Sequence, residues 1–186
     1  MITVSDELVD LLHGVDAAAF GLEAEAWTNA LEAAFDRRVD DEGLQDVQRA
    51  AASHGCWNAV YALSAASGLE TSVLVDAEGT VFIDWGSPGL VPVRMHVGAL
   101  APFRVWTHTH PRFGAYWSST DRESLGVATG IVRTALVLGR DGVKRAQNAT
   151  FEAKVEERLA TTGALAAWSA EAPVPWTEDW QQEACA

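Results

Sequence analysis

The sequence contains few cysteines, no long apolar run and no recognisable leader. Its two cysteines, Cys56 and Cys185, lie far apart in the 186-residue chain, which excludes a disulfide framework and a Cys-x-x-Cys metal site. We expect Cys56 to be a small buried residue. No apolar run approaches the ~18 residues that a membrane-spanning helix needs. The N-terminal sequence MITVSDELVDLL lacks a cationic segment followed by an apolar stretch, so a cytoplasmic protein without a membrane partner is expected.

Basic residues are also scarce. The chain has 13 lysines and arginines against 26 aspartates and glutamates, which gives a net charge of −13. Such a surface repels phosphate backbones, so nucleic acid is not an expected partner. The 48% of hydrophobic and 21% of charged residues are typical of a globular protein with a core of its own.

The first third of the chain has a helical pattern. Residues 1–67 are predicted to be helical, and Trp27, Leu31 and Phe35 recur at i, i+4 and i+8, which places one apolar stripe toward a core. Residues 56–67 are apolar throughout and fit either a buried helix or a strand.

From Thr71 onward the pattern changes to short strands rich in β-branched and aromatic residues. Strands are expected at residues 71–76, 80–85, 91–97, 103–107, 134–139 and 143–147. Thr120 and Glu123 fit a capping box, which predicts a helix that begins near residue 120. A last helix is expected at residues 151–168, and the tail beyond Pro173 is read as a docking arm or as partly disordered. The order predicts an α/β or α+β fold.

The residues with most chemical information are His108, His110, Ser118 and Asp121. Residues i and i+2 of a strand face the same side, so the two histidines can present both imidazoles to one ion. Asp121, in the first turn of the expected helix, supplies a third ligand of the kind that catalytic zinc sites use. Asp121 and Ser118 also suit a helix N-terminus, and the two roles are compatible.

This pattern resembles a known family signature. His-x-His-Pro at residues 108–111, then seven residues between His110 and Ser118, then Ser-x-x-Asp, is similar to the motif of the JAMM (MPN-plus, JAB domain) zinc metalloproteases. The resemblance implies that His108, His110 and Asp121 bind Zn²⁺ and that Ser118 donates a hydrogen bond to the developing oxyanion.

The resemblance also implies a fold and its organisation. It predicts a single MPN-like domain with a curved, mostly antiparallel sheet flanked by helices, formed by residues 68–172. Residues 1–67 are then an extra N-terminal helical segment, and residues 173–186 form a C-terminal tail. The N-terminal helices could cover the substrate groove, support a homodimer or complete the core.

The family also requires a glutamate that acts as general base. Glu70, just before the strand TSVLVD, is our candidate, because it resembles the arrangement in the RadC-like branch. A rival alignment lays WNAVYAL over the strand that carries the glutamate. It puts Asn58 at the position of the glutamate, and an amide side chain cannot act as a general base.

For function, the resemblance implies a small prokaryotic hydrolase of amide or isopeptide bonds. Its expected substrate is the glycine-ended tail of a ubiquitin-like modifier or sulfur-carrier protein, or a peptide. Trp106, Tyr116 and Trp117 either line the substrate groove or pack in the core. The alternatives are a RadC-like protein with another substrate and a non-catalytic MPN binding module.

Overall fold

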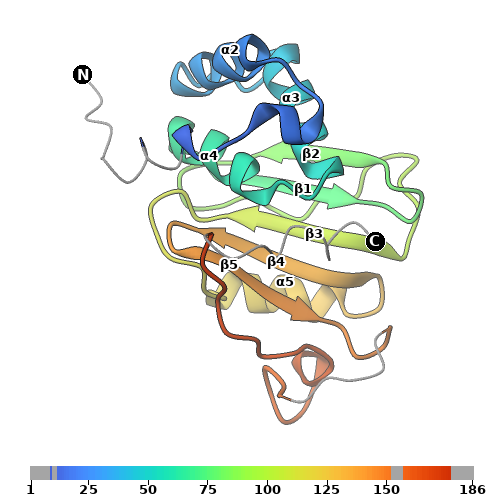
Figure 1. Ribbon diagram of the computed structural model, residues 1–186. Coiled ribbons are helices and arrows are strands. Elements are labelled where there is room, and N and C mark those ends of the chain that lie inside the picture. Colours follow the sequence, from blue (N-terminus) through green and yellow to red (C-terminus); the bar gives the residue numbers. More distant parts are fainter. Residues whose placement is uncertain (1–8, 10–11, 152–156, 177–186) are drawn as a thin grey trace.

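The computed structural model describes residue 9, residues 12–151 and residues 157–176 (Figure 1). Its helical elements are η1 (Ala17–Phe20), α2 (Ala24–Phe35), α3 (Glu42–Ser53), α4 (Trp57–Ser67), α5 (Ser119–Ala128) and η2 (Ala164–Ala167). Its strands are β1 (Thr71–Val75), β2 (Val81–Trp85), β3 (Phe103–Thr109), β4 (Val132–Gly139) and β5 (Gly142–Gln147). None of the described helices is long and apolar enough to cross a bilayer.

The five strands form one open sheet in the order β2-β1-β3-β4-β5. Three neighbouring pairs are antiparallel, whereas β3 and β4 are parallel and are connected through α5. The fold is therefore α+β with a mostly antiparallel sheet, as the sequence predicted, and both expected hairpins, β1-β2 and β4-β5, are confirmed.

Helices cover both faces of the sheet. Helices α2, α3 and α4 lie together on one side, and α5 lies on the other (Figure 1). Residues 57–67, which fitted a helix or a strand, form α4, which is apolar on all sides because it lies between the sheet and the outer helices. It ends at Gly68, which has the left-handed φ of 68° that glycine tolerates.

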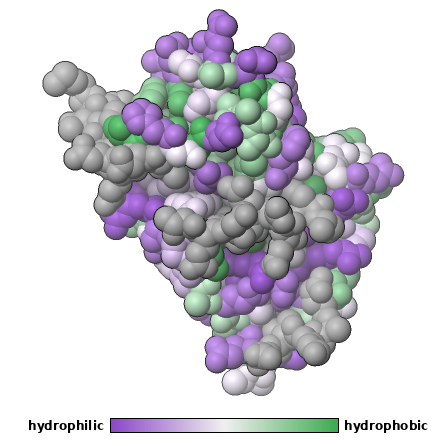
Figure 2. Space-filling view, in the orientation of Figure 1, coloured by the Kyte–Doolittle hydropathy of each residue, from purple (hydrophilic) through white to green (hydrophobic). Residues whose placement is uncertain are grey.

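The N-terminal helices complete the core. Trp27, in the predicted apolar stripe, is buried, and Leu31 and Phe35 pack against the same cluster. Cys56 is buried there as well, as expected. In the space-filling view, hydrophilic side chains protrude from the outer surface at the top of the molecule, over α2 and α3 (Figure 2).

The period of two along the strands sorts side chains between the two helical layers. On β1, Val73 and Val75 belong to the cluster beneath α2–α4, whereas Leu74 belongs to the cluster beneath α5. On β3, Val105 faces the first cluster and Trp106 the second. From Val105 onward, the even-numbered residues of β3 therefore face α5.

The strand predicted at residues 91–97 does not form. Leu90 makes an isolated bridge to Ser87, and the segment after it has no regular structure. Pro92 has no N–H to donate to a neighbouring strand. The neighbouring positions of β1 are already taken by β2 and β3.

The helix predicted at residues 151–168 is wrong over its described part, and residues 152–156 lie outside the described residues. Residues 157–168 form a loop with only the short η2, because Gly163 adopts a left-handed φ of 75° and Arg158 bridges to Ser169. Trp168 is buried beneath α5, and its Nε1 donates to Leu125 O at 2.9 Å.

The first part of the tail docks on the domain. Val174 pairs with Val143 at the edge of the sheet. Trp176 stacks on Tyr61 with ring centroids 5.7 Å apart, and its Nε1 donates to Gly139 O at 2.9 Å. Residues 173–176 thus form the docking arm, whereas residues 177–186, with Cys185, lie outside the described residues.

Candidate metal centre

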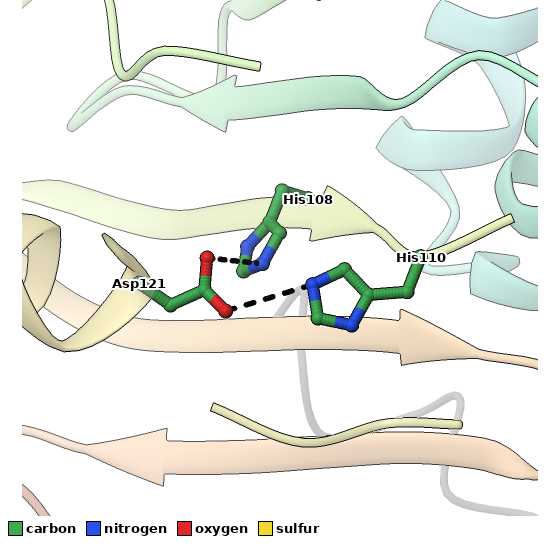
Figure 3. Close-up of side chains that lie close together, drawn as sticks. All are labelled: His108, His110 and Asp121. Carbon is green, nitrogen blue, oxygen red and sulfur yellow. Dashed lines mark ion pairs between the residues drawn. The ribbon is translucent and has the colours of Figure 1, made fainter. Parts of the chain in front are cut away.

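Three side chains from β3 and α5 point toward one another (Figure 3). His108 lies on β3 and faces α5 because it is an even-numbered residue of that strand. His110 directly follows the strand, and Asp121 lies in the first turn of α5. The cluster therefore forms where β3 ends and the helix of the β3-α5-β4 crossover begins, which is a frequent position for sites in α/β folds.

The distances suit a metal ion. His108 Nε2 lies 2.9 Å from Asp121 Oδ1, and His110 Nε2 lies 3.5 Å from Asp121 Oδ2. One nitrogen or oxygen from each residue lies within 4.8 Å of the others. Tetrahedral zinc with bonds of 2.0–2.2 Å places neighbouring ligand atoms roughly 3.4 Å apart, so these atoms need only small shifts to share one ion.

His108 provides an independent test of this fit. Its side chain is 2% exposed, yet neither ring nitrogen has a hydrogen-bond partner among the residues that the structure describes. Nε2 instead lies 2.9 Å from Asp121 Oδ1, in an ion-pair contact. Because a buried imidazole needs polar partners, a cation shared between His108 Nε2 and the Asp121 carboxylate would suit this position. The chemistry of the donor set, two imidazoles and a carboxylate, agrees.

Aromatic rings and a backbone carbonyl orient the two imidazoles. The His108 ring stacks on Trp106 with centroids 5.2 Å apart, and Tyr116 lies 4.9 Å from His110. His110 Nδ1 is 3.4 Å from Gly114 O. A proton on Nδ1 directed at that carbonyl leaves Nε2 free for an ion.

Ser118 is the N-cap of α5, and Asp121 completes a capping box with it. Ser118 Oγ accepts from Asp121 N at 3.2 Å, and Asp121 Oδ2 accepts from Ser118 N at 2.7 Å. The capping box predicted at Thr120 and Glu123 is therefore two residues too late. The cap fixes the Asp121 carboxylate toward the histidines, and the Ser118 O–H hydrogen is still available for a ligand.

The electrostatics of the cluster hold Asp121 ionised. Burial alone would raise the pKa of Asp121, but both histidines and Ser118 outweigh it and keep the pKa well below its ordinary value. Burial lowers the pKa of His108. The pKa of His110 is raised, because Asp121 and Glu70 outweigh the effect of burial. The carboxylate and a neutral His108 are the forms that bind metal.

Glu70, the candidate general base, lies beside this cluster. It is buried, lines the same cavity as His110, Ser118 and Asp121, and accepts a hydrogen bond from the backbone of Val91. Burial raises the pKa of Glu70 to about 6, with His110 opposing the rise and Asp121 adding to it. A carboxyl group with such a pKa can exchange a proton near neutral pH.

The rival alignment through Asn58 does not fit. It requires residues 57–63 to be a strand, but they belong to α4. The residues that line the cavity beside the cluster, within the described part of the chain, do not include Asn58.

The cavity beside the cluster has a volume of about 530 Å³. Trp106 and Tyr116 line it, whereas Trp117 is buried in the core. The lining draws on residues 89–95 and on α5, and among the described residues it includes none from the N-terminal helices. Those helices therefore do not cover the groove.

The wall at residues 89–95 was missed by sequence reasoning, because its valines had the pattern of a strand. Its only sequence signal is Pro92.

No family model, no curated protein and no solved structure matches the chain.

Proposed function

We propose that the protein is a zinc-dependent hydrolase of amide bonds, of the JAMM type that the motif resembles. The observation that carries the proposal is the convergence of His108, His110 and Asp121, all three buried, with ligand atoms that lie within 4.8 Å of one another. The position of Glu70 on the same cavity supports it further. A ubiquitin-like modifier, a sulfur-carrier protein or a peptide stays the predicted source of the amide.

In this proposal, His108, His110 and Asp121 hold the metal. A bound zinc ion supplies a Lewis acid and lowers the pKa of water toward about 7. Glu70 accepts a proton from the attacking water and passes it to the leaving amine, a role that its raised pKa suits. Ser118 donates its O–H to the oxygen of the amide carbonyl as negative charge develops there.

The test compares two glutamate variants under zinc-replete conditions. The zinc-loaded protein is incubated with a mixed peptide library and a linear ubiquitin-like fusion, and products are identified by mass spectrometry. Glu70→Gln should reduce the cleavage rate by roughly 10²-fold or more with unchanged zinc content. Glu78→Gln is the matched control, since Glu78 is exposed in the β1-β2 turn, and it should cleave like the wild type.

The outcomes separate the alternatives. Cleavage that survives Glu70→Gln contradicts the assigned base. A wild-type protein that retains zinc but cleaves no member of either substrate set contradicts the hydrolase proposal and favours a non-catalytic MPN binding module.

A further inference from the structure

The walls of the cavity beside the cluster are predominantly apolar. Leu90, Val91 and Met95 line it from the segment after β2, and Val127, Ala128 and Ile131 line it from α5 and the turn that follows. Leu90, Met95 and Val127 are all more than half exposed. Large apolar side chains gathered at the mouth of one cavity mark a surface that binds an apolar group.

The size of the cavity is important because it exceeds what a glycine tail would fill. An extended run of glycines presents only backbone, and it would leave the apolar walls in contact with water. A volume of about 530 Å³ lies in the range of sites that enclose a whole small ligand. A bulky apolar side chain would replace that water and bury the exposed valine and leucine surface.

The charges around the cavity restrict the occupant further. Its lining includes three carboxyl groups, those of Glu70, Asp121 and Glu123, together with His110, and no lysine or arginine lines it within the described chain. A carboxylate placed along the walls, away from the metal, would therefore meet like charge without a lysine or arginine to pair with. The walls favour an uncharged group.

We infer that the substrate carries a bulky, uncharged apolar group next to the scissile amide, and that this group binds between residues 90–95 and α5. This inference rests on the proposed function and narrows its substrate. Such a substrate differs from the glycine-ended tail that the resemblance implied. Here an apolar side chain determines specificity, whereas a glycine tail has no side chain to recognise.

The test uses three zinc-binding hydroxamates that differ only in the attached group. Acetohydroxamate is the small reference, hydrocinnamoyl hydroxamate adds a phenyl group, and succinate monohydroxamate adds a carboxylate. Their affinities for the zinc-loaded protein are measured by isothermal titration calorimetry. Burying a side chain of phenyl size corresponds to a roughly 10- to 100-fold gain in affinity, so the hydrocinnamoyl compound should bind at least tenfold tighter than the other two.

Two valine variants locate the effect. Val127→Glu places a charge on the cavity wall and should remove most of the phenyl advantage, while acetohydroxamate binding and zinc content stay unchanged. Val97→Glu is the matched control, since Val97 is fully exposed and lies outside the lining, and it should retain the advantage.

Equal affinity for acetohydroxamate and the phenyl compound would overturn the inference while leaving the zinc site in place. An advantage that Val127→Glu does not reduce would overturn the assigned location. Failure of all three hydroxamates to bind would count against the proposed zinc site itself, and it would remove the basis of the inference with it.

Discussion

Thr107 and Thr109 lie two residues apart on β3, on the face opposite the histidines, and both are completely buried. Their hydroxyl groups differ in hydrogen bonding. Thr109 Oγ1 accepts from Thr71 N at 2.9 Å and lies 2.5 Å from Ser64 Oγ. Thr107 Oγ1 has no hydrogen-bond partner among the described residues. Valine substitutions at the two positions therefore compare a used hydroxyl with an unused one.

The expected effects have opposite signs. Valine has nearly the shape of threonine, so neither change leaves a cavity. Thr109→Val leaves the buried Thr71 N–H unpaired, which costs about 2 kcal/mol of unfolding free energy. Thr107→Val removes a buried hydroxyl that makes no bond, which is neutral or stabilising by about 1 kcal/mol. The two variants should differ by about 2–3 kcal/mol, or roughly 4–12 °C in Tm for a chain of this size.

Urea unfolding followed by tryptophan fluorescence measures the difference, since the chain has eight tryptophans. The same samples report on the site, because Thr109 lies between the two histidines and bonds to the residue after Glu70. Thr109→Val should also weaken zinc binding, whereas Thr107→Val should not. Equal destabilisation by both substitutions, or a larger loss at Thr107, would refute this reasoning.

Two further predictions concern stability. Burial acts to raise the pKa of Asp76, but backbone N–H donors that include those of Thr80 and Leu100 outweigh it and lower the pKa. The ionised Asp76 therefore stabilises the fold above the ordinary aspartate pKa, and this stabilisation is lost as pH falls through the lowered value. Asp76→Asn should therefore cost about 2 kcal/mol at pH 7 and progressively less in urea titrations at lower pH; a pH-independent loss would contradict this. Trp176→Ala removes the stack on Tyr61 and the bond to Gly139 O and should cost about 2 kcal/mol, and an unchanged urea midpoint would show that the docking arm does not stabilise the domain.

The cluster of His108, His110 and Asp121 was predictable because its determinants are local. Strand periodicity places His108 and His110 on one face, and a helix that begins at Ser118 turns Asp121 back toward them. The sequence motif contains both relationships within fourteen residues, from His108 to Asp121. Glu70 lies far from this motif along the chain, so its position beside the cluster was harder to predict. Only the pairing of β1 with β3 brings Glu70 close to the histidines.

The errors arose where tertiary contacts outweigh local pattern. The valines at 91–97 alternate like a strand, but Pro92 and the fully paired β1 prevent it, and Val91 instead closes the cavity. Residues 157–168 contain good helix formers, yet the burial of Trp168 beneath α5 and the left-handed Gly163 favour a loop. Neither outcome follows from the sequence of the segment alone.

The zinc content of the purified protein tests directly whether His108, His110 and Asp121 bind a metal ion. Elemental analysis compares the wild type, the double variant His110→Ala/Asp121→Ala and a matched control, His96→Ala/Asp84→Ala. The control removes another His–Asp pair: His96 Nε2 lies 2.8 Å from Asp84 Oδ2, and Asp84 belongs to β2. Circular dichroism confirms that each variant is folded.

We expect about one zinc ion per chain in the wild type and in the control, and almost none in His110→Ala/Asp121→Ala. A wild type that holds no zinc after purification without chelators and with zinc resupplied would contradict this expectation. Full zinc content in the His110→Ala/Asp121→Ala variant would contradict it equally.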